Sequence, residues 1–201
     1  PVSRPYWIEY SEGDIIMNQH SANRIGVFHP SIQTLVEYSI PSKNPNWADC
    51  EGIDNCGIAQ VFGFASDGEK IWFTEWVENN IGFVDTSIPL PFSVDINTHR
   101  LSSSILPLEK GQTAEVTLKV TTASGWNGMP IDASVNYSST STFSDIIIEP
   151  ELNNFSPSDT PTTISIQISA SEHALSGTHK VLLGAYTDEI AVSQFITVII
   201  P

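Results

Sequence analysis

Two stretches of the sequence repeat one pattern, and they decide the fold of the first half of the chain. IIMNQHSANRIGVF at residues 15–28 can be laid over IWFTEWVENNIGFV at residues 71–84, an offset of 56 residues. Both copies begin with an apolar segment, pass through a polar pair (NQ or TE) and end in N-x-I-G followed by two apolar residues. Each copy is therefore predicted to be one supersecondary unit of a repeat.

The flanking segments complete each repeat. An inner strand with a Gly-containing turn is predicted at residues 5–13 and again at 61–68, and an outer strand at 35–41. Four short strands per repeat, with a Gly turn between the first two, are typical of a β-propeller blade. The fold class predicted for residues 1–91 is thus a partial β-propeller of two blades.

A family resemblance rests on the strings IWFTEW (71–76), NNIG (79–82), NRIGVF (23–28) and LVEYSIP (35–41). Together they resemble the blade consensus of the streptogramin B (virginiamycin B) lyase family of propellers. A propeller closes with about four to eight blades, so two blades leave open strand edges. We therefore expect further propeller blades, or another protein chain, at the open blade edge.

The resemblance implies a magnesium-dependent carbon–oxygen lyase that uses a histidine of a PHGI motif and the glutamate of a WFTE motif. Glu75 occupies the glutamate position, and Gln19 is its equivalent in the first repeat. The histidine is not found: Gln60 stands at its place in the second repeat, and Pro5 or Tyr6 in the first. An amide cannot act as a general base near neutral pH.

Catalysis by these two blades alone is therefore not expected, and Glu75 is interpreted as a buried or channel-lining hydrogen-bond acceptor. No cofactor is expected under this interpretation. The alternative is a magnesium-dependent lyase-type or lactonase-type propeller enzyme whose catalytic residues lie on blades outside this chain.

A second all-β domain is predicted over residues 92–201, after the proline-interrupted segment TSIPLPF at 86–92. Apolar and polar residues alternate cleanly in the segments 114–122 and 162–170, as half-buried sandwich strands require. The layout resembles the Ig-like β-sandwich modules of bacterial and archaeal surface proteins and glycosidases. Its seven strands are expected near 92–98, 114–122, 130–139, 143–149, 162–170, 178–187 and 190–200. The last of them is apolar on both faces, so it is covered by a neighbour or leads towards a membrane anchor.

Cysteines and sequons indicate an extracellular or cell-surface location. Cys50 and Cys56 are close in sequence and are predicted to form a local disulfide, which persists where the environment oxidises thiols. Two free thiols are the alternative. Asn136 and Asn154 each begin an N-x-S sequon and are candidate glycosylation sites.

Histidines and aromatic residues provide weaker candidate sites. His20 and His29 flank a predicted strand of the first repeat and are candidate copper or zinc ligands if they meet across a turn. The remaining histidines are interpreted as surface residues. Five aromatic residues form either a sugar- or peptide-binding platform or, as the preferred interpretation, packing between blades. They are Tyr6, Trp7, Trp47, Trp72 and Trp76.

Charge excludes two classes of partner. The chain carries 8 Lys+Arg against 23 Asp+Glu, a formal net charge of −15, and such a field repels nucleic acid and anionic lipid surfaces. The sequence predicts an extracytoplasmic binding or scaffolding component. It is expected to be a fragment or subunit of a larger surface-layer or membrane-associated assembly.

Overall fold

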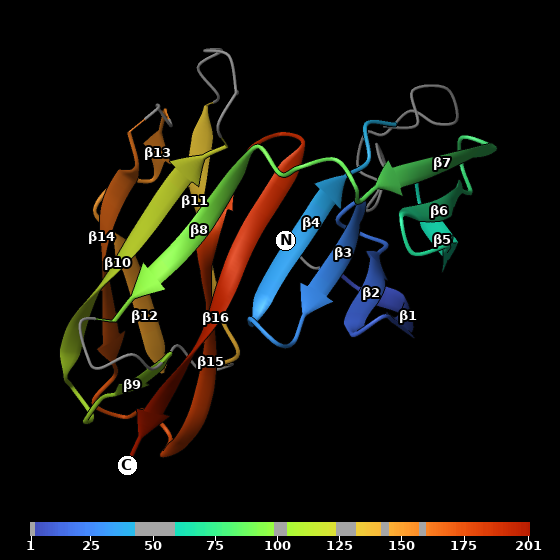
Figure 1. Ribbon diagram of the computed structural model, residues 1–201. Helices are drawn as coiled ribbons and strands as arrows, with labels where there is room; N and C mark the ends of the chain where they lie inside the picture. The colour runs from blue at the N-terminus through green and yellow to red at the C-terminus, as the bar shows by residue number, and fades with distance from the viewer. Residues whose placement is uncertain (1–2, 43–58, 99–103, 124–131, 142–144, 157–159) are drawn as a thin grey trace, which may run out of the picture. The chain divides into compact units, whose positions relative to one another are not determined.

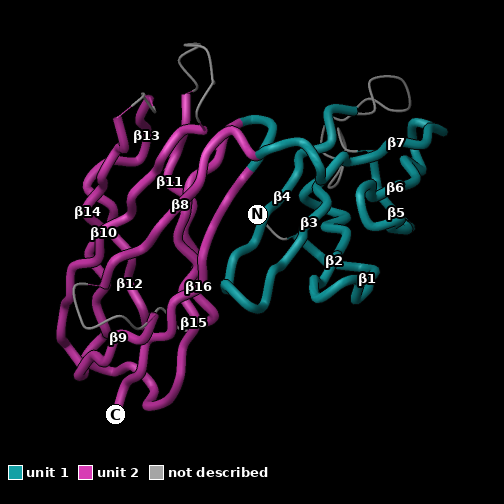
Figure 2. Tube along the Cα trace, in the orientation of Figure 1, with its two compact units in different colours: residues 1–89, 188–190 teal, residues 90–187, 191–201 magenta. Residues whose placement is uncertain are grey.

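The computed structural model describes residues 3–42, 59–98, 104–123, 132–141, 145–156 and 160–201. The regular structure of this part of the chain is β-strand (Figure 1), so the all-β prediction is confirmed. The described residues contain no helix long and apolar enough to cross a membrane. The chain divides into two compact units, residues 1–89 with 188–190 and residues 90–187 with 191–201 (Figure 2).

The first unit contains two antiparallel sheets. The first sheet follows the chain order β1 to β4, and the second follows β5 to β7. The strands are β1 (Pro5–Ser11), β2 (Asp14–Gln19), β3 (Arg24–His29), β4 (Thr34–Ser39), β5 (Val61–Ser66), β6 (Lys70–Glu75) and β7 (Asn80–Asp85).

The 56-residue repeat extends to details of the backbone. β2 and β6 have equivalent bounds at this offset, and so do β3 and β7. The β1–β2 ladder shifts register between Pro5 and Ile8, and the β5–β6 ladder shifts at the equivalent Val61 and Phe64. Positive φ angles also recur in pairs: Arg4 with Gln60, Glu12 with Gly68, and Asn23 with Asn79. The two sheets are therefore copies of one supersecondary unit.

The glycine of N-x-I-G is required because side chains of the preceding strand cross over it. A Cβ at Gly26 would lie 3.1 Å from Nε2 of Gln19 and 3.2 Å from Cγ of Met17. A Cβ at Gly82 would lie 2.6 Å from Cζ of Phe73, closer than real Cβ atoms approach. Both glycines thus leave room for the residues of the neighbouring strand.

The core of the first unit lies between its two sheets. Residues alternate between the two faces of a strand, so each sheet buries one apolar set against the other. The first sheet contributes Ile16, Ile25, Val27 and Ile40, and the segment 59–73 contributes Ala59, Val61, Ile71 and Phe73.

The second unit also contains two sheets. One has the strand order β12-β14-β10-β8, and the other has the order β16-β15-β11-β13 with β9 paired in parallel to β16. The strands are β8 (Phe92–Asn97), β9 (Ile105–Pro107), β10 (Thr113–Thr122), β11 (Ala133–Ser139), β12 (Ile146–Pro150), β13 (Asn154–Phe155), β14 (Thr162–Ala170), β15 (Gly177–Tyr186) and β16 (Ile190–Ile200). A strand lies at each of the seven predicted places, and β9 and β13 are additional.

The core of the second unit follows the alternation read from the sequence. Val116 and Leu118 of β10 are fully buried, as are Ile164 and Ile166 of β14. Ile196 and Val198 of β16 are buried as well, whereas Ile199 on the opposite face is 38% exposed. A sandwich-like β fold is consistent with these two layers.

The second repeat lacks the fourth strand that the blade interpretation predicted. At the repeat offset, β4 corresponds to residues 90–95, which overlap β8. β8 pairs with β10 of the second unit, and Phe92 and Val94 are buried there. None of the sheets in the described part of the chain closes on itself, and the two-blade propeller stays an interpretation.

Candidate functional site

Glu75, the candidate catalytic residue, lies at the end of β6 on the face that packs against the first sheet. Its side chain is 6% exposed, and Oε1 lies 3.3 Å from the position that a Cβ of Gly82 would take. Oε2 is buried and has no hydrogen-bond partner. A buried carboxylate oxygen without a donor is unfavourable, because the group has lost its water without replacement.

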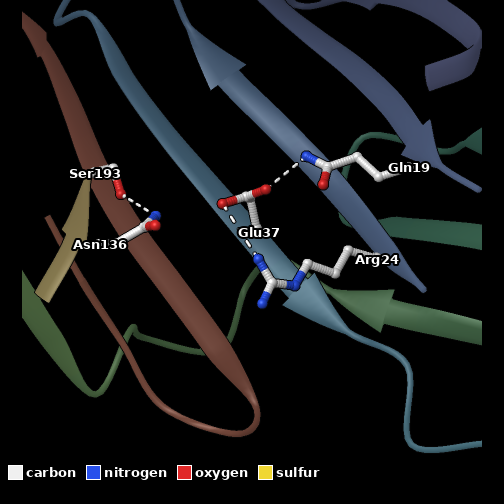
Figure 3. Close-up of polar contacts among 5 residues, drawn as sticks. All are labelled: Gln19, Arg24, Glu37, Asn136 and Ser193. Carbon is white, nitrogen blue, oxygen red and sulfur yellow. Dashed lines mark hydrogen bonds and ion pairs between the residues drawn. The ribbon is translucent and has the colours of Figure 1, made fainter. Parts of the chain in front are cut away.

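Gln19, the repeat equivalent of Glu75, has the partner that Glu75 lacks. Its Nε2 donates a hydrogen bond of 2.6 Å to Oε1 of Glu37 on β4 (Figure 3). Arg24 Nη1 lies 3.6 Å from Oε2 of the same carboxylate. Gln19 and Glu37 approach each other beside Gly26 of the intervening strand, because glycine has no side chain there. The sequence analysis missed Glu37, although it sits between apolar residues in the predicted outer strand.

A similar polar pair flanks a glycine in the second unit. Asn136, Gly184 and Ser193 are successive cross-strand partners on β11, β15 and β16. Asn136 Nδ2 donates to Oγ of the buried Ser193 at 2.9 Å, as Figure 3 shows. The same nitrogen would have to carry a glycan. A glycan on Asn136 would therefore be attached to the nitrogen that makes this contact.

Asn154 is better placed for glycosylation than Asn136. It is exposed, and its Oδ1, not its Nδ2, accepts a hydrogen bond of 2.7 Å from Oγ of Ser134. The amide nitrogen is not used in that bond. Glycosylation at Asn154 stays a prediction.

The two candidate metal-binding histidines lie at opposite ends of the β2–β3 hairpin, so the expected approach across a turn is wrong. His20 follows β2, and its Nδ1 lies 3.2 Å from the carbonyl oxygen of Val61. His29 ends β3, and its Nδ1 lies 2.7 Å from Oδ1 of Asp14. Within the described ranges, no three His, Cys, Asp or Glu side chains gather in a way that could hold a metal ion. Cys50, Cys56 and the predicted disulfide lie outside the described residues.

The described aromatic residues are mostly exposed, and packing between blades stays an interpretation for them. Tyr6 is 65% exposed, Trp7 53% and Trp76 70%. Phe62 packs against both Tyr6 and Trp76, with ring centroids 5.3 Å apart in each case. His20 adds a contact to Phe62 at 5.1 Å. Trp47 lies outside the described residues.

The two sheets differ most on one pair of equivalent faces. On the first sheet, Ile25 is 0% exposed and Val27 5%, because the second sheet packs on them. At the same positions of the second sheet, Ile81 is 75% exposed and Phe83 50%. We call the first set the covered face and the second set the open face. The covered face is Ile16, Asn18, Ile25 and Val27, and the open face is Trp72, Thr74, Ile81 and Phe83.

Asn18 joins the covered face to the second sheet. Its Oδ1 accepts hydrogen bonds from the backbone N–H groups of Tyr6 and Trp7, which lie at the register shift of β1. Its Nδ2 donates to the carbonyl oxygens of Val61 and Phe62, at 2.7 and 3.2 Å. One buried amide thus satisfies four backbone groups on two sheets.

Thr74, the equivalent of Asn18, satisfies the backbone of its own sheet alone. Its Oγ1 accepts a hydrogen bond of 3.3 Å from the N–H of Gly63, at the register shift of β5. The open face therefore keeps the local part of the Asn18 arrangement.

The open face combines aromatic rings with charged groups at its margin. The rings of Trp72 and Phe83 lie 4.9 Å apart, and Nζ of Lys70 lies 5.1 Å from the Phe83 ring. Asp67 accepts hydrogen bonds from the backbone N–H of Lys70 and from Nε1 of Trp72, at 2.7 and 3.2 Å. These bonds, first of all the one from the Lys70 backbone, lower the pKa of Asp67. The surface is an apolar patch with the cation Lys70 and the anions Asp67 and Asp85 at its rim.

Comparisons with known proteins identify no family. No known protein family matches the chain, and no curated protein matches it. Solved structures that resemble it include domains 4 and 5 of the S-layer protein SbsC, with 12% identity over 65% of this chain and a TM-score of 0.38. The longer S-layer protein fragment rSbsC(31-844) aligns over 96% of this chain at 12% identity and a TM-score of 0.36.

A family 123 glycoside hydrolase from Clostridium perfringens aligns over 55% of this chain, with 13% identity and a TM-score of 0.37. The alignments cover 64% of the SbsC two-domain structure, 24% of the longer SbsC fragment and 27% of the glycoside hydrolase. The chain thus spans less than two-thirds of the length of each.

Proposed function

We propose that this chain is an extracellular binding and scaffolding component whose first unit joins a further β-sheet from another polypeptide. In this proposal the two sheets of the repeat are propeller-like blades, and the open face of the second is the surface on which the next sheet stacks. The second unit is an Ig-like module of the same surface assembly.

The observation that carries the proposal is the difference between the covered and open faces. Ile25 and Ile81 occupy one position of the repeat, yet they are 0% and 75% exposed. Fully burying a side chain of this size stabilises by roughly 1.5–3 kcal/mol, so the open face is a favourable surface for association. A sheet that stacked there would bury Trp72, Ile81 and Phe83 as the second sheet buries Ile16, Ile25 and Val27.

An extracellular location is supported by the sequence. The pair Cys50 and Cys56 fits an oxidising environment, and the sequon at Asn154 lies on an exposed strand. The net charge of −15 favours solubility and disfavours nucleic acid as a partner.

The burial of Glu75 favours scaffolding over the enzymatic alternative. A catalytic carboxylate has to reach a substrate, whereas Glu75 is 6% exposed on the face that packs against the first sheet. His20, which follows β2 of the first sheet, is directed at the Val61 carbonyl oxygen.

Site-specific photo-crosslinking tests the proposal. Phe83 is replaced by p-benzoylphenylalanine in the protein as the producing cells make it, and intact cells are irradiated. The matched control carries the same replacement at Ile147, which is 45% exposed on β12 of the second unit. We expect an adduct from position 83 to a strand of a further N-x-I-G repeat, identified by mass spectrometry, and none from position 147. Equal yields at the two positions would refute the stacking surface.

Surface labelling of the same cells tests the location. A membrane-impermeant amine reagent should modify the exposed Lys110 in intact cells. Labelling that requires lysis would contradict the extracellular assignment.

A further inference from the structure

The second sheet ends one strand earlier than the first. β3 pairs with β4 through six residues, Arg24 to His29. β7 is the equivalent of β3 and is the last strand of its sheet among the described residues. The outer side of β7 therefore presents the N–H and C=O groups of an edge strand, which is a template for another strand.

Glu75 identifies what such a strand has to bring. Gln19 reaches beside Gly26 to Glu37 on the neighbouring strand, with Nε2 as the donor. Glu75 reaches beside Gly82 in the same way, because its Oε1 lies 3.3 Å from the position that a Cβ of Gly82 would take. Because Glu75 is acceptor-only when ionised, the position equivalent to Glu37 has to carry a hydrogen-bond donor.

The residues that flank this donor are also determined by the register. On β4, Tyr38 pairs with Ile25 and Val36 pairs with Val27. A strand added to β7 in the same register places its two flanking residues opposite Ile81 and Phe83 of the open face. Cross-strand pairs of apolar or aromatic side chains stabilise a sheet, so both flanking residues should be apolar.

The chain's own candidate for this place is engaged elsewhere. Residues 90–95 correspond to β4 at the repeat offset, but residues 92–97 pair with β10 along six residues. Phe92 is 1% exposed in that sheet. Residues 92–97 therefore do not complete the second sheet.

We propose that the outer edge of β7 binds an extended strand of another polypeptide, antiparallel to β7, with the pattern apolar–donor–apolar and the donor opposite Gly82. This inference rests on the proposed scaffolding function and states the chemistry of the partner strand. The donor is Gln, Asn, Lys or Arg, and its bond goes to Oε1 of Glu75, the oxygen beside Gly82.

The first sheet supplies the probe for the test. The acid peptide is residues 33–40, QTLVEYSI, and the donor peptide is the same sequence with Glu37→Gln. Each is titrated into the full chain and followed by NMR, which detects even millimolar binding. In the wild-type protein the donor peptide should bind at least about tenfold more tightly, because the acid peptide brings a carboxylate against the buried Glu75.

A substitution that replaces the acceptor-only carboxylate by an amide makes the test specific. In Glu75→Gln the new amide can donate to the acid peptide, as Gln19 donates to Glu37, so the preference should move to the acid peptide. The control Glu69→Gln removes the same charge at an exposed position of the same sheet and should leave the wild-type preference unchanged.

The outcomes separate this inference from the scaffolding proposal. Amide shifts confined to β7 and its neighbours, together with the reversed preference, support strand addition. Equal affinities for the two peptides, binding that maps outside residues 80–85, or no binding would each overturn it. Crosslinking from position 83 to a stacked sheet would still stand in those cases, because stacking uses the open face and not the edge of β7.

Discussion

The first and second sheets of the repeat share a backbone plan and differ in their neighbours. Both have the same strand bounds in their second and third strands, the same register shift and the same glycine. The first sheet has a fourth strand and a covered face, whereas the second has neither among the described residues. The comparison shows that the local sequence builds each sheet, while burial is decided by what packs next to it.

The polar residues of the two sheets show the same division. Gln19 and Glu75 both extend beside a glycine, but the partner of Gln19 is on the strand that the second sheet lacks. Asn18 and Thr74 both serve the register shift of the first strand, but Asn18 alone of the two also bonds to a neighbouring sheet. Equivalent positions of the repeat thus place their side chains similarly, but the hydrogen-bond partners of those side chains differ.

The largest expected difference is between Ile25→Ala and Ile81→Ala. Ile25 is 0% exposed, so its truncation leaves a cavity and should lower the free energy of unfolding by about 3 kcal/mol. Ile81 is 75% exposed, and its truncation should cost less than about 0.5 kcal/mol. Urea unfolding of the purified chain, monitored by a signal from the first unit, measures both losses of unfolding free energy. Equal losses would mean that the open face is covered in the isolated protein.

A smaller difference is expected between Asn18→Ala and Thr74→Ala. Asn18→Ala leaves backbone groups of two sheets without their partner and should cost roughly 2 kcal/mol. Thr74→Ala removes a long, exposed contact to Gly63 and should cost about 0.5 kcal/mol or less. Hydrogen exchange at the Tyr6 and Trp7 amides should rise in Asn18→Ala. Unchanged protection there would show that Asn18 does not hold the register shift.

The smallest expected effect is a pH dependence confined to the second sheet. Hydrogen bonds from the Lys70 backbone and Trp72 lower the pKa of Asp67, while the equivalent position of the first sheet is Ser11. A lowered pKa in the folded state means that these bonds are fully present above the usual carboxyl range and are lost as the pH falls through the lowered value. Trp72 fluorescence should therefore change below about pH 4. The change should be absent in Asp67→Asn, and a titration that persists in that variant would assign it to another group.

Several features could be predicted from particular residues. The alternation of Val116 and Leu118, and that of Ile164 and Ile166, predicted strands that face a core, and all four side chains are fully buried. The 56-residue offset predicted equivalent strands, and it correctly matched Gln19 to Glu75 in position. These successes rest on periodicity, which follows directly from strand geometry.

Other features could not be predicted, because they depend on contacts between segments far apart in the sequence. The exposure of Trp72 and Trp76 was missed, since a tryptophan in a strand gives no sign of whether a neighbour covers it. The approach of His20 to His29 was wrong, because the hairpin register places them at opposite ends. The roles of Asn18 and Glu37 appear only when the strands beside them are in place.

By itself, the sequence determined that the chain is all-β, that its first half is a repeat, and which residues alternate along each strand. These properties follow from side-chain periodicity and from the glycine at which neighbouring side chains cross. The tertiary structure alone decided that residues 92–97 join the second unit, that Ile81 and Phe83 stay exposed, and that Glu75 is buried without a donor. The physical reason is that a strand carries two faces and two edges, and which of them is covered depends on partners the local sequence does not encode.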